Sequence, residues 1–147
     1  MGFRYNSEGV KMEKEFSVAP EGDYLLKIVK ASDQKKGING GMEDRVTKNG
    51  DPYVNVECEI VDGEFEGNKV FHNVTFMLDK TKKGAGIAVH FLKTIGEPWE
   101  GDFEVEPERW IDNQFRAHLR VSKDLQGRPK NEIAFVLDDS KDAEVPF

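Results

Sequence analysis

The chain has 147 residues, a formal net charge of −7, 37% hydrophobic residues and 10% aromatic residues. This length suits one domain, and the apolar content suffices for a hydrophobic core, which excludes a wholly disordered chain. No run of about 18 apolar residues is present, which excludes a membrane-spanning helix. Residues 1–16 lack the apolar core of a secretory signal, and Cys58 is the single cysteine, so we expect a cytoplasmic protein without disulfides.

Charge is segregated along the chain. Segments 27–48, 80–96 and 116–130 carry net charges of +3, +4 and +4, whereas 49–79 and 97–115 each carry −6. One interpretation is a surface of mixed charges that keeps the protein soluble. The other is a basic groove on an acidic protein, which requires the basic segments to meet in the fold.

Five segments alternate apolar and polar residues with the two-residue period of half-buried strands. They are 23–31, 53–61, 69–79, 114–122 (with Val121 on the apolar face) and 132–137. Between the first two lies a glycine-rich segment, 32–51, which we expect to form a long loop or an irregular hairpin with a tight turn at Asn49-Gly50.

Apolar residues recur at helical spacing across 81–95, with Ile87 at the start of the apolar stripe. Thr81 is the predicted N-cap and Gly96 the predicted stop. Three strands, a helix and two strands is the order of an OB-fold, whereas a β-sandwich needs about seven strands and no such helix. We therefore predict a mainly β fold, a five-stranded OB-fold Greek-key barrel with one capping helix between strands 3 and 4.

The domain organisation follows from these elements. We expect an N-terminal arm at 1–19, the OB-fold domain at 20–137 and an acidic C-terminal tail at 138–147.

OB-folds bind oligonucleotides or oligosaccharides across strands two and three and the adjoining loops. A single strand of nucleic acid requires cations for its phosphates and aromatic rings on which its bases stack. Outward aromatic residues, strand cations and loop cations meet these requirements. The predicted single-stranded DNA-binding residues are Tyr53, Phe71, Lys35, Lys36, Arg45, Lys48, Arg116, His118, Arg120, Lys123, Arg128 and Lys130.

Each of these residue types also has an ordinary structural use. Phe71 and Tyr53 can pack under a loop or the arm, and Arg116 and Arg120 can pair with the carboxylates of 97–112. The two tryptophans lie in that acidic segment, so we expect them in the core or at its rim rather than against phosphates.

No catalytic constellation is evident. The three histidines, His72, His90 and His118, fall on different elements without metal-ligand spacing, and no HExxH, P-loop or GxSxG motif occurs. Cys58 falls on the apolar face of its strand, where a thiol is inert. We therefore expect no enzymatic activity, no metal and no cofactor.

The chain ends in an acidic stretch followed by an aromatic tip. A partner can bury the ring, bind the terminal carboxylate and pair its own cations with the acids; the alternative is a terminus that only aids solubility. The residues predicted to bind partners are Asp138, Asp139, Asp142, Glu144, Pro146 and Phe147.

The tail resembles that of bacterial and phage single-stranded DNA-binding proteins, whose acidic, Phe-tipped ends dock replication and repair proteins. Segments 20–31, 48–76 and 91–96 resemble a domain family from the replication gene clusters of tailed phages, within a similarity spanning about 3–137. This resemblance implies a phage-encoded OB-fold protein that acts on single-stranded DNA in the host cytoplasm.

We expect a non-enzymatic protein that coats single-stranded DNA in phage replication and recombination and recruits replication proteins through its tip. The alternative is an OB-fold adaptor of the replication machinery that does not touch DNA. A replication enzyme such as a nuclease would need clustered carboxylates that hold a metal. The sequence leaves monomer and dimer open.

Overall fold

The structure is a computed structural model and describes residues 2–10 and 18–137. Five strands form one antiparallel sheet in the order β5-β4-β1-β6-β7. They are β1 (Gly22–Ser32), β4 (Tyr53–Ile60), β5 (Lys69–Thr75), β6 (Gln114–Lys123) and β7 (Pro129–Val136).

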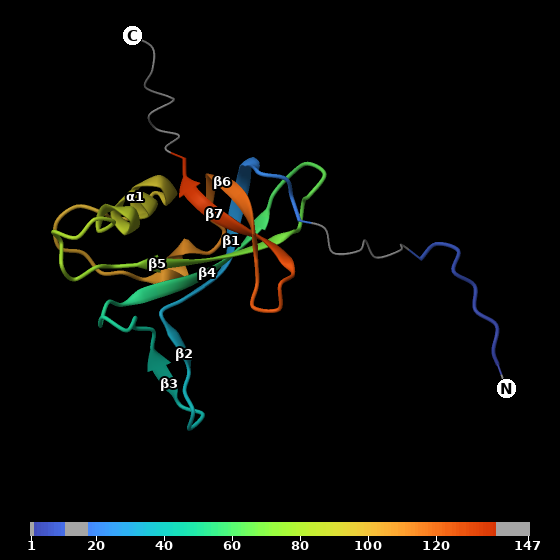
Figure 1. Ribbon diagram of the computed structural model, residues 1–147, viewed down its shortest axis with the longest axis horizontal. Coiled ribbons are helices and arrows are strands. Elements are labelled where there is room, and N and C mark those ends of the chain that lie inside the picture. The colour runs from blue at the N-terminus through green and yellow to red at the C-terminus, as the bar shows by residue number, and fades with distance from the viewer. Residues whose placement is uncertain (1, 11–17, 138–147) are drawn as a thin grey trace, which may run out of the picture.

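The long central strand β1 joins the two halves of the sheet. Its residues 22–27 pair with β6, and residues 26–32 pair with β4 across an irregularity between Ile28 and Lys30. The sheet therefore curls until its edge strands, β5 and β7, contact each other and nearly close a barrel (Figure 1). The predicted mainly β, five-stranded barrel is confirmed, with helix α1 (Gly86–Ile95) between β5 and β6. This arrangement is consistent with an OB-like fold.

Several predicted element boundaries were wrong. Segment 32–51 is the hairpin alternative rather than a plain loop: it contains the two-stranded hairpin β2 (Gln34–Lys36) and β3 (Met42–Asp44), and the Asn49-Gly50 turn is confirmed by the left-handed Gly50 at φ 88°. The third barrel strand ends at Thr75 rather than Asp79, because the Asp51 carboxylate accepts a 3.0 Å hydrogen bond from the Leu78 amide and draws the chain out of the sheet.

The helix starts later than its predicted cap. Thr81 bonds the Asp79 carboxylate instead of capping the helix, which begins at Gly86. Gly96 ends it in a left-handed conformation at φ 84°, as predicted. The expected apolar stripe is buried at Ala88, Phe91, Leu92 and Ile95, but Ile87, expected at its start, is 61% exposed. No helix in the described parts of the chain is long and apolar enough to cross a bilayer.

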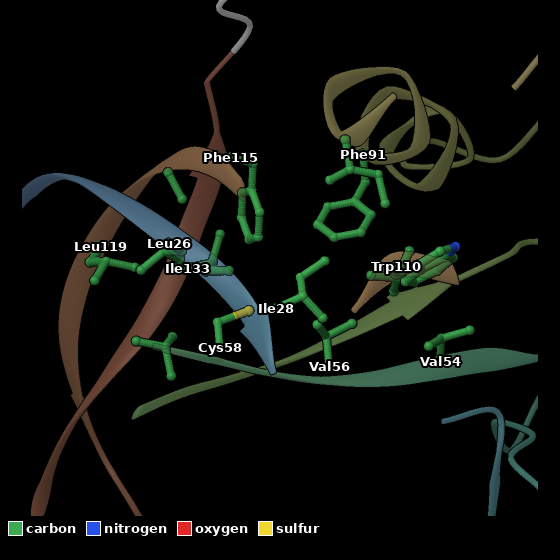
Figure 2. Close-up of a cluster of buried hydrophobic side chains, with 14 of the residues drawn as sticks. Leu26, Ile28, Val54, Val56, Cys58, Phe91, Trp110, Phe115, Leu119 and Ile133 are labelled. Carbon is green, nitrogen blue, oxygen red and sulfur yellow. The ribbon is translucent and has the colours of Figure 1, made fainter. Parts of the chain in front are cut away.

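Helix α1 covers one end of the barrel with a cluster of aromatic rings (Figure 2). The Phe91 ring lies 5.6 Å from that of Trp110 and 5.2 Å from that of Phe115, centroid to centroid. Trp110 belongs to the short 3-10 helix η1 (Pro107–Trp110) and is fully buried, as expected of a core residue. Cys58 is also buried, which raises its thiol pKa to about 12. Val121, expected inside, is 45% exposed because the β6–β7 hairpin extends beyond the core.

Candidate nucleic-acid interface

The outward face of β4 and β5 carries both predicted stacking residues. Their side chains lie on opposite strands, two cross-strand rows apart, at a separation of about 14 Å from strand geometry. They therefore cannot stack on one base, and each offers a site for a separate base. The outward pairs are Tyr53–Thr75, Asn55–Asn73, Glu57–Phe71 and Glu59–Lys69.

Phe71 is 57% exposed and projects from β5. Its cross-strand neighbour Glu57 forms an ion pair with the Lys69 ammonium at 3.2 Å, and Glu59 forms a second with the same ammonium at 2.7 Å. These bonds lower the pKa of Glu59 and raise that of Lys69. The face beside Phe71 is thus an ion-paired network in which the carboxylates are partly neutralised.

Between the two aromatic residues lies a pair of amides that the sequence analysis did not single out. The Asn55 side chain donates a hydrogen bond of 2.8 Å to the Asn73 side chain. Each amide keeps further donor or acceptor capacity for a ligand on this face. The alternation that pointed to Tyr53 and Phe71 also places these residues outward and could have found them.

Tyr53 and Arg45, both predicted to bind DNA, are brought together. Tyr53 is half-buried, and the Arg45 guanidinium carbon lies 6.0 Å from its ring centroid, at the limit of a cation–π contact. The Arg45 Nε also donates a 3.0 Å hydrogen bond to the Gln34 carbonyl. Arg45 therefore ties the β2–β3 hairpin to the start of β4 and places a cation over an aromatic ring.

A hollow of about 340 Å³ lies beside this pair, on the outward side of β1 and β4. Two cations, Lys30 and Arg45, line it together with the Ser32 hydroxyl, the Asn55 amide and the Glu57 carboxylate. The combination of cations, a hydroxyl and an amide suits a phosphate and its sugar. Lys30 and Ser32 were not among the predicted residues.

The hairpin carries the other predicted cations of this side. Lys35 and Lys36 are exposed on β2, and Lys48 is exposed in the turn that precedes β4. In the view of Figure 1 the hairpin projects below the barrel, as does the β6–β7 turn. The first basic block thus borders the β4–β5 face.

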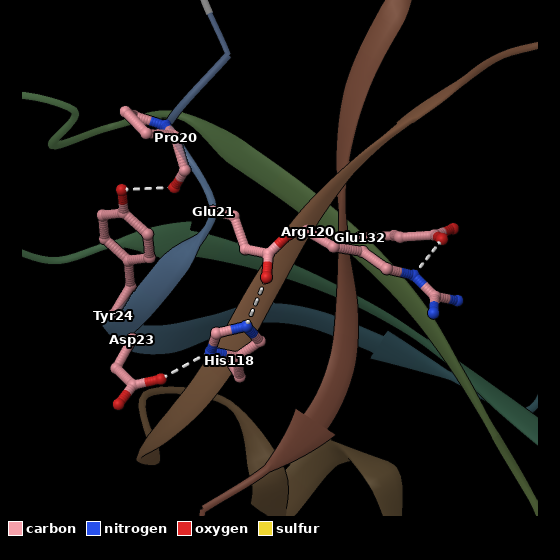
Figure 3. Close-up of polar contacts among 7 residues, drawn as sticks. All are labelled: Pro20, Glu21, Asp23, Tyr24, His118, Arg120 and Glu132. Atoms are coloured by element: carbon pink, nitrogen blue, oxygen red, sulfur yellow. Dashed lines mark hydrogen bonds and ion pairs between the residues drawn. The ribbon is translucent and has the colours of Figure 1, made fainter.

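His118, on β6, contacts acids from the start of the first barrel strand (Figure 3). Its Nδ1 lies 2.7 Å from an Asp23 oxygen and its Nε2 3.2 Å from a Glu21 oxygen. The ring stacks on Phe135 of β7, with centroids 4.8 Å apart and planes within 7°. The two carboxylates raise the pKa of His118, so its positive charge is used within this cluster.

We predict that the His118 cluster stabilises the fold in a pH-dependent way. Because its folded-state pKa is raised above the usual 6.5, the contribution is complete below about pH 6.5 and is lost as pH rises through the folded-state pKa. Thermal unfolding should show a larger deficit of His118→Gln at about pH 5.5 than at about pH 9. Phe135→Leu, which leaves the carboxylates in place, should keep the pH dependence; a pH-independent deficit in His118→Gln would contradict the prediction.

The remaining predicted cations lie on β6, β7 and their turn, separated from β4 by β1. Arg120 forms an ion pair with Glu132 (Figure 3), and the Arg128 Nε lies 3.4 Å from the Asp124 carboxylate. Lys123 and Lys130 are exposed. Arg120 therefore pairs with Glu132 and not with the acids of 97–112, which were its alternative partners.

Arg116, also a predicted DNA-binding cation, is exposed on β6, opposite Leu25 of β1.

The predicted tail residues lie outside the described part of the chain: Asp138, Asp139, Asp142, Glu144, Pro146 and Phe147. Among residues 2–10 and 18–137, no group of three or more His, Cys, Asp or Glu side chains is arranged to hold a metal ion.

A larger groove, of about 830 Å³, opens between α1 and the segments on either side of it. Tyr53 forms one edge, and Phe76, Trp99 and Phe103 supply further aromatic lining. Trp99 is partly buried, with the Lys93 ammonium 5.3 Å from its ring centroid. This places Trp99 at the rim of the core, as expected.

Residues 3–104 match a family described as a protein of unknown function (DUF669). The chain belongs to this family. The match to the DUF669 family includes all three segments on which the resemblance rests, 20–31, 48–76 and 91–96, and ends before η1. The chain is also 23% identical over 147 residues to enolase-phosphatase E1 of Synechococcus sp. (strain CC9902). That alignment covers 96% of this chain and 57% of the relative, so the chain spans little more than half of the relative's length.

Proposed function

We propose that this DUF669 protein binds single-stranded DNA without catalysing a reaction on it. The observation that carries the proposal is the outward face of β4 and β5, where an exposed Phe71, an amide pair and the Arg45–Tyr53 contact adjoin a hairpin with two exposed lysines, Lys35 and Lys36. In OB-folds this face and the adjacent loop are the usual site for oligonucleotides.

Stacking supplies the first part of the binding energy. Phe71 offers a solvent-exposed ring, and base–aromatic stacking contributes about 1–3 kcal/mol per base with little regard to sequence. At the other end of the face, Tyr53 and Arg45 offer a ring and a flat guanidinium. We therefore expect two bases to stack, one at each end, with the Asn55–Asn73 amides between them.

Phosphate contacts supply the second part of the binding energy and define the path of the DNA strand. The Glu57 and Glu59 carboxylates of β4 repel phosphates, even though Lys69 partly neutralises them, and Glu57 also lines the small hollow, where it opposes the two cations. Lys30 and Arg45 line the small hollow, and Lys35, Lys36 and Lys48 are exposed close by on the hairpin side. The sugar-phosphate backbone is thus expected along the hairpin, with the bases directed toward β5.

The acidic remainder of the protein favours single strands over duplex. With a total charge of −7, the cationic surface is local, and a rigid duplex would bring many more phosphates near the carboxylates. We also propose that the tail recruits replication or recombination proteins and that the protein is phage-encoded. These two statements rest on the sequence resemblance.

An adaptor that binds proteins and not DNA is the second candidate, favoured by the apolar groove beside α1. The phosphatase named for the Synechococcus relative would be a third. No residue cluster in 2–10 and 18–137 has the arrangement of a metal site that could support it. The DNA-binding proposal accounts for the cations around Tyr53, which the adaptor leaves unexplained.

Photo-cross-linking tests where DNA lies. An oligonucleotide containing 5-iodouracil is irradiated with the full chain, and cross-linked peptides are identified by mass spectrometry. We expect adducts on Phe71 and Tyr53, with the Phe71 adduct lost in Phe71→Leu. Phe135, of similar exposure (54% against 57%), is the internal control on β7. Adducts confined to Phe135, or none at low salt, would count against the proposal.

A further inference from the structure

The groove beside α1 has the size and chemistry of a site for aromatic side chains. Its volume of about 830 Å³ lies within the roughly 300–1,000 Å³ range of protein binding pockets. Leu78, one of the lining residues, is 68% exposed, and Ile87 beside the groove is 61% exposed, which extends the apolar surface. Apolar and aromatic side chains dominate the lining, among them Phe76, Met77, Val89, Trp99 and Phe103.

The residues that line the groove carry a small excess of acid. Asp33 and Asp102 line it, against a single lining cation, Lys80. Outside this lining both charges occur: Glu100 and Glu104 are exposed near Asp102, Lys82 and Lys83 are exposed near Lys80, and the Lys93 ammonium lies over the Trp99 ring. A ligand that combines rings with one cation placed against Asp33 or Asp102 therefore suits the groove.

The N-terminal segment of the chain has this composition. Phe3 is 93% exposed and Tyr5 is 70% exposed, and the exposed Arg4 lies between them. Aromatic side chains can bury about 150–250 Å² each, and aromatic residues and Arg are enriched in protein interfaces. In the structure these rings bury almost nothing.

The position of the N-terminal segment favours its binding to the groove of another molecule. Figure 1 shows residues 2–10 on the side of the barrel away from α1, the helix that forms one wall of the groove. The stretch from Val10 to Val18 can span at most roughly 28 Å, so the segment can extend well beyond the barrel that carries it. A second copy of the chain then offers the matching groove.

We propose that residues 3–5 of one copy dock in the α1 groove of a second copy. Phe3 and Tyr5 insert against Trp99 and the other groove aromatics, and Arg4 lies beside the two acids of the lining. Reciprocal exchange joins two copies by two identical contacts, which closes the assembly as a two-fold pair. The contact does not require DNA, although the groove shares Tyr53 with the proposed DNA-binding face.

Sedimentation velocity across micromolar concentrations, without DNA, tests this proposal. The arm variant, Phe3→Ser/Tyr5→Ser, and the groove variant, Leu78→Lys, should each self-associate at least about 10-fold more weakly than the parent. Leu78 is exposed, so its replacement leaves the core intact. Leu125→Lys, at a fully exposed position in the β6–β7 turn, is the matched control and should associate like the parent.

Mixing the two variants provides the sharper test. The arm variant keeps a complete groove and the groove variant keeps a complete arm, so an equimolar mixture should recover one contact per pair and associate more strongly than either alone. Trp99 emission should change with concentration in the parent chain and not in the arm variant. The proposal would be overturned if the arm variant associated as strongly as the parent or if the parent stayed monomeric. It would also be overturned if Trp99 emission differed between the parent and the arm variant by the same amount at every concentration. The last result would mean that the groove binds the arm of the same chain. If association were lost on deletion of 138–147 and kept in the arm variant, the groove would bind the tail instead.

Discussion

Replacement of Tyr53 and Phe71 by alanine together is expected to weaken binding of single-stranded DNA by roughly 30-fold to 10⁴-fold. Each ring contributes about 1–3 kcal/mol, which is about 5- to 150-fold in Kd. Because the two positions are about 14 Å apart on the sheet, each should act on its own base and the effects should add. Fluorescence anisotropy of a labelled oligothymidine, with both single variants and the double variant, measures this.

The matched control is Phe135→Ala, which removes a ring of similar exposure from β7. That ring stacks on His118 and lies outside the β4–β5 face. The control should bind like the parent chain, and circular dichroism should show each variant folded. An unchanged Kd for the double variant, or equal losses in the control, would contradict a binding site on β4 and β5.

Replacement of Trp110 by alanine is expected to lower the free energy of unfolding by about 3–5 kcal/mol. The ring is fully buried and contacts Phe91, through which α1 is held over the end of the barrel. Since domains are stable by only about 5–15 kcal/mol, this loss is a large part of the total. Urea unfolding followed by circular dichroism gives the value.

Trp110→Phe should cost less than the alanine variant, for two reasons. It keeps a ring against Phe91, and it removes an indole Nε1 that is buried without a hydrogen-bond partner. Leu125→Ala, at an exposed turn position, should change stability by less than about 0.5 kcal/mol. A loss below about 1 kcal/mol for Trp110→Ala would mean that the barrel end does not depend on this ring.

The barrel was predictable from the sequence because apolar and polar residues alternate along its strands as buried and exposed positions do. On β4 the burial of Val54, Val56 and Cys58 follows the alternation residue by residue. The predicted end of β5 was wrong because the alternation runs on after Thr75, whereas the Asp51 carboxylate, distant in sequence, redirects the chain. A contact of that kind leaves no local pattern.

The arrangement of the site was only partly predictable. Period-two alternation placed Tyr53 and Phe71 on one outward face, and the structure bears this placement out. Charge blocks could not show that Arg45 would lie over Tyr53 or that His118 would be held by Asp23 and Glu21. Those pairings depend on strand register and on a hairpin that folds back, which are properties of the closed barrel.

Equilibrium titration of the full chain with oligothymidine and with a duplex of equal length, at about 50 and about 200 mM salt, tests the account most directly. We predict tighter binding to the single strand at both salt concentrations. Contacts from three to five of the cations near Tyr53 imply a slope of log affinity against log salt of roughly −2 to −4, or about a 10- to 200-fold loss across this range. Absence of binding at the lower salt concentration, or equal affinity for the duplex, would contradict the proposal that this face binds single-stranded DNA.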